Sequence, residues 1–560
     1  MPRPEAPRRR LVLDAIVLGV AGAVCAWIFN AILHGASDLL LHGLAGYRPP
    51  GLPSEGESAV ESIGPRGLWM IPVTTTLGGL AVGLITSWLA PEAEGHGTDA
   101  VVRSFHRDGG RLRLRVAPVK LLASAITIGS GGAAGREGPI ALAAGALGSW
   151  YAGWSRRSED ERRMLLLMGT AAGVSAIFRS PIGAALFAVE VLYADMEFEA
   201  SALLYATLSA IIAYAVGGLS SGFGALLTVH GPLVALESRL DYGWYAVLGI
   251  AAGLLATVLP VLFYRVRDGF RALPGPEWIK PAIGGLLTGL IALALPQIVG
   301  GGYGWMQAAF DGRLAFGLMI TLVVGKMVAM SFSIASGGSG GVFAPTLFVG
   351  AMLGGACATV ADLPSAPFAV VGMAAVFAGA AHVPFATMMM VTEITGGYTL
   401  LVPAALAVLL SYLVQRQLSS GLSYRSIYAA QVGSRGESPA HHTEHLEIAI
   451  RILREKRISK LEHLDNLDLV SLLRSGLPVD IGGGRRLLVG ILRQDSSFAN
   501  TSIATSGRVL AGADTNVIAI LRQEHMLAPR PDTILQPGDR LVLVAGAEGM
   551  AMLHAHLDPW

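Results

Sequence analysis

The sequence predicts an all-α polytopic membrane protein followed by a small C-terminal α/β domain. The chain has 560 residues, of which 52% are hydrophobic and only 14% are charged, whereas soluble domains carry about 25% charged residues. Apolar segments recur from residue 11 to residue 415, and a polar stretch then leads to short strand-like runs. A soluble protein of this length is therefore excluded, and the net charge of +1 argues against a nucleic-acid partner.

The first apolar run, at 11–33, follows a basic N-terminus that contains Arg3, Arg8, Arg9 and Arg10. About 20 helical residues span a bilayer, so this run is long enough to cross. A cleaved signal peptide is the alternative, but no convincing small-residue cleavage site follows the run. Because basic residues stay on the cytoplasmic side, we expect a multi-pass protein of the plasma or inner membrane with both termini in the cytoplasm.

The remaining apolar segments are shorter and more broken. They lie at 67–90, 116–129, 139–153, 163–177, 181–194, 200–217, 243–264, 281–299, 313–335, 345–360, 367–381, 384–395 and 399–415. Several are too short to span the hydrocarbon, and Gly/Pro-rich breaks with charged residues join them. Irregular backbone at membrane depth is stable only where protein buries it or where it lines a watery cavity. The breaks therefore predict a transport site.

Two parts of the membrane region repeat one another, with halves at about 67–217 and 243–416. The first stretch, 119–139, resembles the second, 325–345. The matched residues are Lys120 with Lys326, Ser130-Gly131-Gly132 with Ser336-Gly337-Gly338, Pro139 with Pro345, and Gly169, Pro181 and Glu190 with Gly372, Pro384 and Glu393. Biased composition is the alternative explanation. The repeat alone leaves open whether the halves are parallel or inverted.

Three glycine-rich stretches near membrane depth, at 95–97, 135–139 and 340–345, are candidate anion-binding helix starts. Pro139 and Pro345 suit the first turn of a helix. A helix N-terminus presents unpaired N–H groups and the positive end of the helix dipole, which together bind anions. The sequence thus predicts an anion site inside the membrane region.

These stretches also resemble the signatures of the chloride-channel (CLC) family. GREGP at 135–139 is the most specific, GGVFAP at 340–345 is similar to the second pore stretch, and GHGTD at 95–99 is similar to the first, with His96 where many members have Ser. The resemblance covers about residues 10–430. It implies a homodimer in the lipid bilayer, with one voltage-gated chloride pathway per subunit built from two inverted halves, and no cofactor.

The resemblance also assigns site residues. Glu137 would be the gating glutamate, and the chloride-binding residues would be His96, Gly97, Arg136, Glu137, Gly138, Gly341, Val342, Phe343, Ala344 and Tyr428, with Tyr424 as the alternative to Tyr428. A carboxylate just before a buried helix N-terminus competes with an anion for the same amides. Its protonation would release it, and buried intramembrane acids are functional by default.

Channel and exchanger differ at one position. Family exchangers carry a proton-transferring glutamate where this chain has Val191, directly after Glu190. Valine carries no proton, so the sequence favours a passive chloride channel. A proton-coupled antiporter is the alternative, with Glu190, or a nearby acid among Asp195, Glu197 and Glu199, relaying protons through water.

His96 and Asp99 depart from the family pattern. An imidazole donates one N–H when neutral and two when charged, so we hypothesise that His96 makes flux sensitive to pH near 6–7. The alternative is a histidine packed at the vestibule without anion contact. Asp99 stands where the family has Pro, which leaves the local backbone path open.

The C-terminal region divides into a linker with an amphipathic helix at 431–480 and a domain at 481–560. Strands are expected at 487–492, 517–521 and 541–545, and a helix at 548–556. The stretches at 516–520, 531–539 (PDTILQPGD) and 541–544 resemble the RCK_C, or TrkA_C, module of potassium-conductance regulators. The resemblance implies a dimerising domain that binds an unidentified small molecule.

Other functions find less support. The potassium-type tail suggests a cation channel or transporter, but no carbonyl filter such as TVGYG occurs in the sequence. His441, His442 and His445 fit a solvated linker better than a metal site, and no metal is expected. Cys25 and Cys357 are too few and too far apart for a disulfide or zinc framework. No clustered catalytic groups indicate an enzyme.

Overall fold

The chain forms two compact units, Met1–Gln431 and Val432–Trp560. A computed structural model describes residues 6–229, 239–434, 438, 440, 479–482, 485–506, 515–522, 525–527, 529, 533–553 and 555–559. The expected amphipathic helix within 431–480 and the histidines 441, 442 and 445 lie outside these residues. The two units are described separately.

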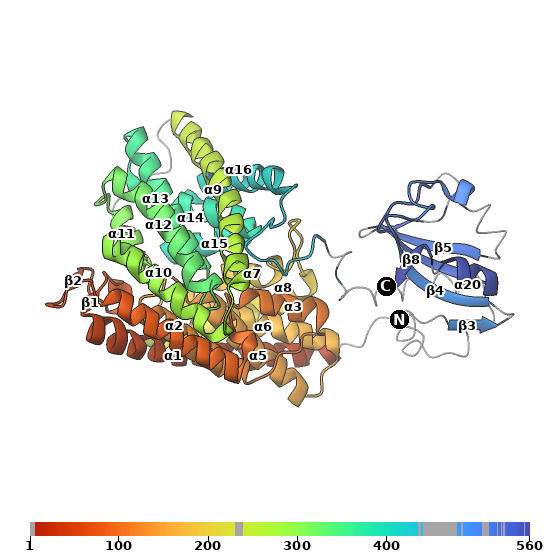
Figure 1. Ribbon diagram of the computed structural model, residues 1–560, viewed down its shortest axis with the longest axis horizontal. Coiled ribbons are helices and arrows are strands. Elements are labelled where there is room, and N and C mark those ends of the chain that lie inside the picture. The colour runs from red at the N-terminus through yellow and green to blue at the C-terminus, as the bar shows by residue number, and fades with distance from the viewer. Residues whose placement is uncertain are drawn as a thin grey trace. The chain divides into compact units, whose positions relative to one another are not determined.

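The first unit is helical (Figure 1). Its helices are α1 (Ala6–Ser37), α2 (Ile71–Leu89), α3 (Thr98–Arg107), α4 (Val116–Gly129), α5 (Glu137–Trp154), α6 (Glu159–Phe178), α7 (Pro181–Glu190), α8 (Ala200–Ser221), α9 (Arg239–Ala272), α10 (Lys280–Ala294), α11 (Tyr303–Phe310), α12 (Phe316–Ala335), α13 (Phe343–Ala361), α14 (Ser365–Ala381), α15 (Pro384–Thr395) and α16 (Leu401–Ser419). Within the described ranges, eight helical spans are long and apolar enough to cross a membrane. The predicted polytopic all-α architecture is confirmed.

A short irregular segment joins α1 to α2. After α1 the chain forms a π-helical stretch (Asp38–Ala45) and then two two-residue strands, β1 (Tyr47–Arg48) and β2 (Ser62–Ile63), which pair antiparallel. A 3₁₀ turn (Pro53–Glu55) lies between the strands. This segment, which the sequence analysis did not predict, lines a cavity beside Arg136 that is described below.

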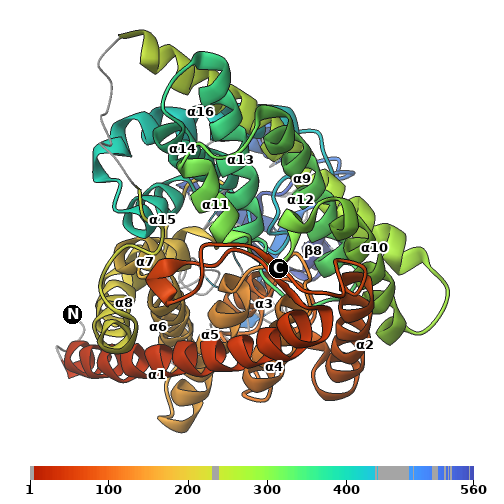
Figure 2. The same cartoon turned by 90° about the vertical axis from the view of Figure 1, so that its left-hand side faces the viewer.

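The two halves pack in the same way. In the first half α5 packs on α6 and α1 packs on α8, while in the second half α13 packs on α14 and α9 packs on α16. Figure 2 shows α1 running past α8, α6 and α4, all of which it contacts. The helices α7 and α15 contact each other and join the halves. Helices α1–α8 are therefore repeated, in order, by α9–α16.

Two glutamates cap helices reciprocally across the repeat. The Glu190 carboxylate, at the end of α7, accepts N–H bonds from Phe385 (3.1 Å) and Ala386 (2.6 Å) in the first turn of α15. Glu393, in α15, accepts N–H bonds from Ile182 (3.1 Å) and Gly183 (2.8 Å) in the first turn of α7. Each carboxylate satisfies amides that a helix leaves unpaired at its start, and the exchange has the form expected of a two-fold related pair.

Two fully buried lysines, one in each half, make equivalent hydrogen bonds. Lys120 in α4 donates to the carbonyls of Ala93 (2.9 Å) and Gly95 (2.6 Å). Lys326 in α12 donates to the carbonyls of Ile298 (2.7 Å) and Gly300 (2.6 Å). Each side-chain amino group thus holds an irregular loop of its own half in place.

The described residues of the second unit include an antiparallel sheet and the helix α20. The strands are β3 (Val479–Gly482), β4 (Arg485–Leu492), β5 (Thr515–Arg522), β6 (His525–Leu527), β7 (Arg540–Ala545) and β8 (Leu557–Pro559), and the helix is α20 (Ala547–Leu553). The strand order is β3-β4-β7-β5-β6, with β8 also paired to β4. The predicted mixed α/β character is confirmed.

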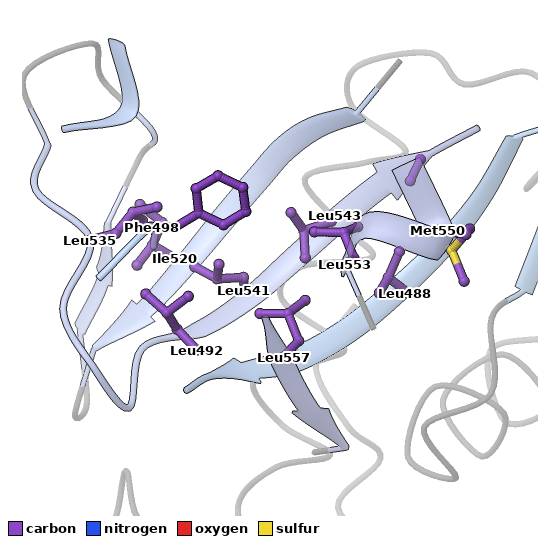
Figure 3. Close-up of a cluster of buried hydrophobic side chains, with 11 residues drawn as sticks. Leu488, Leu492, Phe498, Ile520, Leu535, Leu541, Leu543, Met550, Leu553 and Leu557 are labelled. Carbon is purple, nitrogen blue, oxygen red and sulfur yellow. The ribbon is translucent and has the colours of Figure 1, made fainter. Parts of the chain in front are cut away.

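The core of this unit is formed by side chains from the sheet, from α20 and from the segments around Phe498 and Leu535 (Figure 3). Its buried residues are Leu488, Leu492, Phe498, Ile520, Leu535, Leu541, Leu543, Ala545, Met550, Leu553 and Leu557. Alternate residues of β7, Leu541, Leu543 and Ala545, belong to this cluster, as the period of two along a strand requires. Such a core gives the small domain its own source of stability.

A buried ion pair closes the turn before β7. The Asp539 carboxylate accepts N–H bonds from Arg522 Nε and Nη2, both at 2.8 Å, and from the backbone of Gln536 at 2.7 Å. This pairing raises the pKa of the Arg522 guanidinium, chiefly through the hydrogen bonds to Asp539. Asp539 is 2% exposed, so its charge depends on these partners.

We expect Asp539→Asn to lower the free energy of unfolding of this domain by about 3 kcal/mol, because it removes one partner of a largely buried ion pair. The measurement is proteolytic release of the C-terminal domain from the full-length protein at increasing urea. Asp495→Asn is the matched control, since Asp495 pairs with Arg493 at 3.0 Å on the surface and surface pairs contribute little. Equal urea midpoints for the two variants would contradict the expectation.

Candidate functional site

The three glycine-rich stretches meet and hydrogen-bond to one another. Gly135 and Gly341 exchange two backbone bonds of 2.8 Å each, in an antiparallel bridge. Gly95 donates to the carbonyl of Gly338 at 2.8 Å, and Gly340 donates to the carbonyl of Gly95 at 3.2 Å. The helix starts that follow these loops, those of α3, α5 and α13, are therefore held close together.

Glu137 lies at this meeting point. It is the first residue of α5, its side chain is buried, and its Oε1 accepts the backbone N–H of Phe343, the first residue of α13. The amide of Ala344 also stabilises this carboxylate. Its other oxygen, Oε2, has no hydrogen-bond partner among the residues described. A tethered negative charge thus occupies the N-terminus of α13, where unpaired amides and the helix dipole favour an anion.

Glycines make room for this arrangement. A Cβ added at Gly341 would overlap Glu137 Oε1, and one added at Gly135 would overlap Glu137 Oε2. A Cβ at Gly138 would overlap the carbonyl oxygen of His96, and Gly97 has a φ of 88°, which L residues rarely adopt. The close approach of the loops therefore requires glycine at these positions.

Tyr428 lies next to the same site. Its ring lies 5.3 Å from that of His96, 6.3 Å from Phe187 and 6.4 Å from Phe377, measured between centroids. It is 1% exposed. Its hydroxyl lies near the Thr98 side chain but has no hydrogen bond to any described group. Buried hydroxyls normally find a partner, so this one is available to an anion.

Tyr428 is fixed through its neighbours. Ile427 donates its N–H to the carbonyl of Ala380 in α14 at 2.8 Å, and its own carbonyl accepts the hydroxyl proton of Tyr264 in α9 at 2.7 Å. Tyr424, the alternative from the sequence, instead donates to Asp268 at 2.7 Å and stacks on Tyr264. The structure therefore brings Tyr428, and not Tyr424, to the neighbourhood of His96.

His96 and Asp99 form a pair on the loop that begins α3. His96 Nε2 lies 3.2 Å from Asp99 Oδ2, and Asp99 Oδ1 accepts the N–H of Ala430 at 3.1 Å. Asp99 thereby ties the His96 loop to the segment that carries Tyr428. Sequence reasoning noted Asp99 only as a missing proline, because its partner Ala430 is 331 residues away.

Arg136 faces a different space. Its Nη1 donates to Glu55 at 2.9 Å, and its guanidinium carbon lies 5.0 Å from the ring centre of Tyr303. Its Nε and Nη2 have no hydrogen-bond partner among the described residues. A cavity of about 590 Å³ opens here, lined by Glu55, Arg136 and residues 300–304 among others. We call this cavity the Arg136 mouth.

Glu55 neutralises Arg136 at this mouth, so Glu55→Gln should strengthen chloride binding there. Glu55 is held from the α1–α2 segment, where Ser54 donates to the Leu226 carbonyl at 2.6 Å and its own carbonyl accepts from Arg179 at 3.0 Å. When a cation in a cleft loses its anionic partner, the local concentration of anions in that cleft rises on the order of tenfold. The measurement is chloride flux at low chloride and low ionic strength.

Glu61→Gln is the matched control for Glu55→Gln. Glu61 lies on the same segment, but it is not among the residues that line the cavity, and its carboxylate accepts the hydroxyl proton of Tyr47 at 2.9 Å. Flux that rises equally in both variants would point to general surface charge. An unchanged flux in Glu55→Gln would contradict a role for Glu55 at the mouth.

The remaining predicted residues lie around this centre or apart from it. Val342 precedes α13 and is buried, as is Ala344. Val191 lies at the end of α7, where its carbonyl accepts from Gln431 at 3.1 Å. Glu190 caps α15, as described above. Asp195 pairs with Arg416 at 2.8 Å, and Glu199 accepts the hydroxyl proton of Tyr193 at 3.0 Å.

Several contacts, including that of Asp99 with Ala430, were not predicted from the sequence. The roles of Lys120 and Lys326 in holding loops were signalled only by a charged residue repeated within an apolar stretch. The contact of Glu55 with Arg136 had no signal, because Glu55 lies in a polar segment like any loop. Among the described residues no group of three or more His, Cys, Asp or Glu could hold a metal ion.

Broken helices whose starts converge on a buried carboxylate define the class of this molecule: a polytopic membrane protein with a site suited to anions. A sequence profile described as "Voltage gated chloride channel" matches residues 78–416, and one described as "TrkA-C domain" matches residues 491–558. The chain belongs to the voltage-gated chloride channel (CLC) family and carries a TrkA-C domain at its C-terminal end.

Individual relatives agree with this assignment. The chain is 30% identical over 427 residues to the voltage-gated ClC-type chloride channel ClcB of Escherichia coli O81 (strain ED1a), covering 74% of this chain and 98% of the relative. It is 30% identical over 369 residues to the H⁺/Cl⁻ exchange transporter ClcA of Yersinia pestis bv. Antiqua (strain Angola), covering 64% and 77%.

The fold is shared with a solved structure, that of a slow cyanobacterial Cl⁻/H⁺ antiporter. The TM-score is 0.64 at 21% identity, and the match covers 76% of this chain and 97% of the other. This similarity supports the CLC fold predicted from the sequence.

Proposed function

We propose that this protein moves chloride across a membrane along a pathway that Glu137 plugs when it is charged. The observation that carries the proposal is the position of the Glu137 carboxylate, which accepts the N–H of Phe343 at the start of α13. An anion bound there would use the same amide. Protonation removes the charge of Glu137, so the carboxyl group leaves the amides and an anion replaces it.

Along this pathway we infer three regions. The Arg136 mouth attracts the anion, the amides at the starts of α5 and α13 bind it, and His96 with Tyr428 receives it at the other end. The residues proposed to contact chloride are His96, Gly97, Arg136, Glu137, Gly138, Gly341, Val342, Phe343, Ala344 and Tyr428. Bound chloride needs no cofactor in this scheme.

We propose a passive channel as the mode of transport. Val191 offers no proton-carrying group at the end of α7, and Glu190 beside it is engaged by two amides of α15. The second candidate is proton/chloride antiport, which the relative named as an H⁺/Cl⁻ exchange transporter favours. The acids Glu190, Asp195, Glu197 and Glu199 would then be candidate relays.

An uphill proton assay separates the two modes. Proteoliposomes are given an outward chloride gradient, a proton-selective probe and no other driving force. A channel passes chloride and leaves protons at equilibrium, whereas an antiporter drives protons against their gradient. Sustained uphill proton movement that requires the protein would contradict the channel. A chain that moves potassium and no chloride would contradict anion transport altogether.

The family resemblance is the basis for proposals about assembly and regulation. We propose a homodimer, with one pathway per subunit, that resides in the plasma or inner membrane with both termini in the cytoplasm. The basic residues at the N-terminus support this orientation. We propose that the TrkA-C domain tunes opening by binding a small molecule, and that voltage acts on the charge of Glu137.

A further inference from the structure

His96 carries two ring nitrogens in different surroundings. Nε2 lies 3.2 Å from the Asp99 carboxylate. Nδ1 is buried and has no hydrogen-bond partner among the described residues. The His96 side chain is about 6% exposed, so bulk water does not satisfy Nδ1 either. An unpaired nitrogen in such a place indicates a missing partner.

Tyr428 supplies a second unpaired group beside it. The two rings lie 5.3 Å apart between centroids, and the Tyr428 hydroxyl likewise lacks a hydrogen-bond partner in the described part of the chain. A small anion that accepts one N–H and one O–H would satisfy both groups. The imidazole can do so only if a proton is present on Nδ1.

The tautomer of His96 decides whether that proton is present. With Asp99 ionised and His96 neutral, the proton lies on Nε2, because the carboxylate accepts it. Nδ1 then presents a lone pair, which repels an anion. The opposite neutral tautomer would place a lone pair against the carboxylate and is disfavoured for the same electrostatic reason.

Adding one proton to the His96–Asp99 pair places a proton on Nδ1 of His96. If the proton joins the imidazole, Nε2–H still donates to Asp99 and Nδ1–H donates to the anion. If it joins the carboxylate, Asp99 donates to Nε2 and the neutral ring again carries its proton on Nδ1. In both of these forms the His96–Asp99 pair holds one proton more than in the form that repels the anion. The number of protons taken up is therefore the same whichever of the two residues carries the extra proton.

The surrounding charges act on the same pair. The titratable or charged groups around His96 are Asp99 from α3, Lys120 from α4, Glu137 from α5, Tyr264 from α9 and Tyr428 from the segment after α16. Lys120 is already bound to the carbonyls of Ala93 and Gly95. Glu137 attracts the extra proton while it is ionised and ceases to do so once protonated.

We propose that the His96–Asp99 pair takes up one proton for each anion that binds between His96 Nδ1 and the Tyr428 hydroxyl. The proposal rests on the anion transport proposed above and adds a second proton site to it, separate from Glu137. This end of the pathway thus binds hydrogen ion and halide together. Because the two ligands stabilise each other, lowering the pH strengthens chloride binding and adding chloride draws in protons.

The test uses the Glu137→Gln variant of the full-length protein, which removes the proton bound by Glu137. Sodium chloride is added to weakly buffered protein in detergent near pH 7.5, with sodium gluconate as the control salt, and both proton uptake and chloride binding are measured. We expect nearly one proton per bound chloride. Above the titration range of the pair, the chloride Kd should rise about tenfold per pH unit, as linkage of one proton requires.

Two further changes are made in this background. His96→Ser should abolish the proton uptake. Asp99→Asn should also abolish it, because the Asn amide donates to Nε2 and leaves a proton on Nδ1 of the neutral ring, so the chloride Kd no longer changes with pH. Glu277→Gln is the control: Glu277 is 76% exposed and pairs with Lys280 at 2.7 Å, and its change should leave the uptake intact.

The outcomes are distinguishable. Proton uptake that persists unchanged in Glu137→Gln/Asp99→Asn would overturn the proposal, as would chloride binding to Glu137→Gln with no proton uptake, and in both cases anion transport would stand. Failure of Glu137→Gln to bind chloride at any pH would overturn the proposed function, and this inference with it.

Discussion

Replacing Glu137 by alanine is expected to raise chloride flux at pH 7.5 by about ten- to hundredfold and to remove most of its dependence on pH. The ionised carboxylate holds the amide of Phe343, and a hydrogen bond to a charged group contributes about 1.5–3 kcal/mol. About 1.4 kcal/mol corresponds to a factor of ten. Removing the competing carboxylate should therefore raise the availability of the site to anions about ten- to hundredfold. In the parent protein flux should rise as pH falls, because acid neutralises the plug.

The measurement is chloride efflux from proteoliposomes, recorded with a chloride electrode between pH 4.5 and 8. Glu277→Ala is the matched control, because Glu277 is 76% exposed and pairs with Lys280 at 2.7 Å. The pH dependence left in Glu137→Ala should disappear on addition of His96→Ser. If Glu137→Ala retained the full pH dependence of the parent protein, Glu137 would not be the gate.

Adding a single methyl group at Gly341 is expected to reduce chloride flux at least tenfold. A Cβ there would overlap Glu137 Oε1, so it would occupy the volume that the carboxylate now fills and that the anion is proposed to fill in its turn. The loss should therefore persist in Glu137→Ala/Gly341→Ala, where no carboxylate remains. Overpacking a close contact also costs about 1–3 kcal/mol of stability, so folding is checked by size exclusion and thermal unfolding.

Gly317→Ala provides the control for Gly341→Ala. Gly317 lies in the first turn of α12, and a Cβ added there meets nothing within 4 Å. Its flux and stability should match the parent protein. A folded Gly341→Ala variant with parental flux would show that the anion does not pass beside Gly341.

Several helices could be predicted from the sequence because an apolar run has the same bounds as the helix. The run at 116–129 coincides with α4, and the run at 384–395 coincides with α15. The apolar run at 181–194 extends beyond the helix, since α7 ends at Glu190, whose carboxylate caps a helix of the other half. A helix start was expected at 95–97, but the extent of α3 was not predicted, since TDAVVRSFHR is mostly polar and lacks the apolar signal of a membrane segment.

The parts of the site that could be predicted are those formed by residues that are neighbours in the sequence. Glycine next to an acid and a helix-starting proline places Glu137 at a helix N-terminus, and the repeat points to a second such start at Phe343. The contacts that complete the site connect residues far apart in the chain. Asp99 with Ala430, and Arg136 with Glu55, are set by how the two halves fold together, which no local pattern encodes.

The most direct test of the pathway is an anomalous diffraction map of Glu137→Gln crystals grown in bromide. The account predicts a bromide peak within hydrogen-bonding reach of Phe343 N, between the starts of α5 and α13, and a second peak beside the Tyr428 hydroxyl and His96 Nδ1 at acid pH. A well-ordered map with no bromide between these helix starts would contradict it.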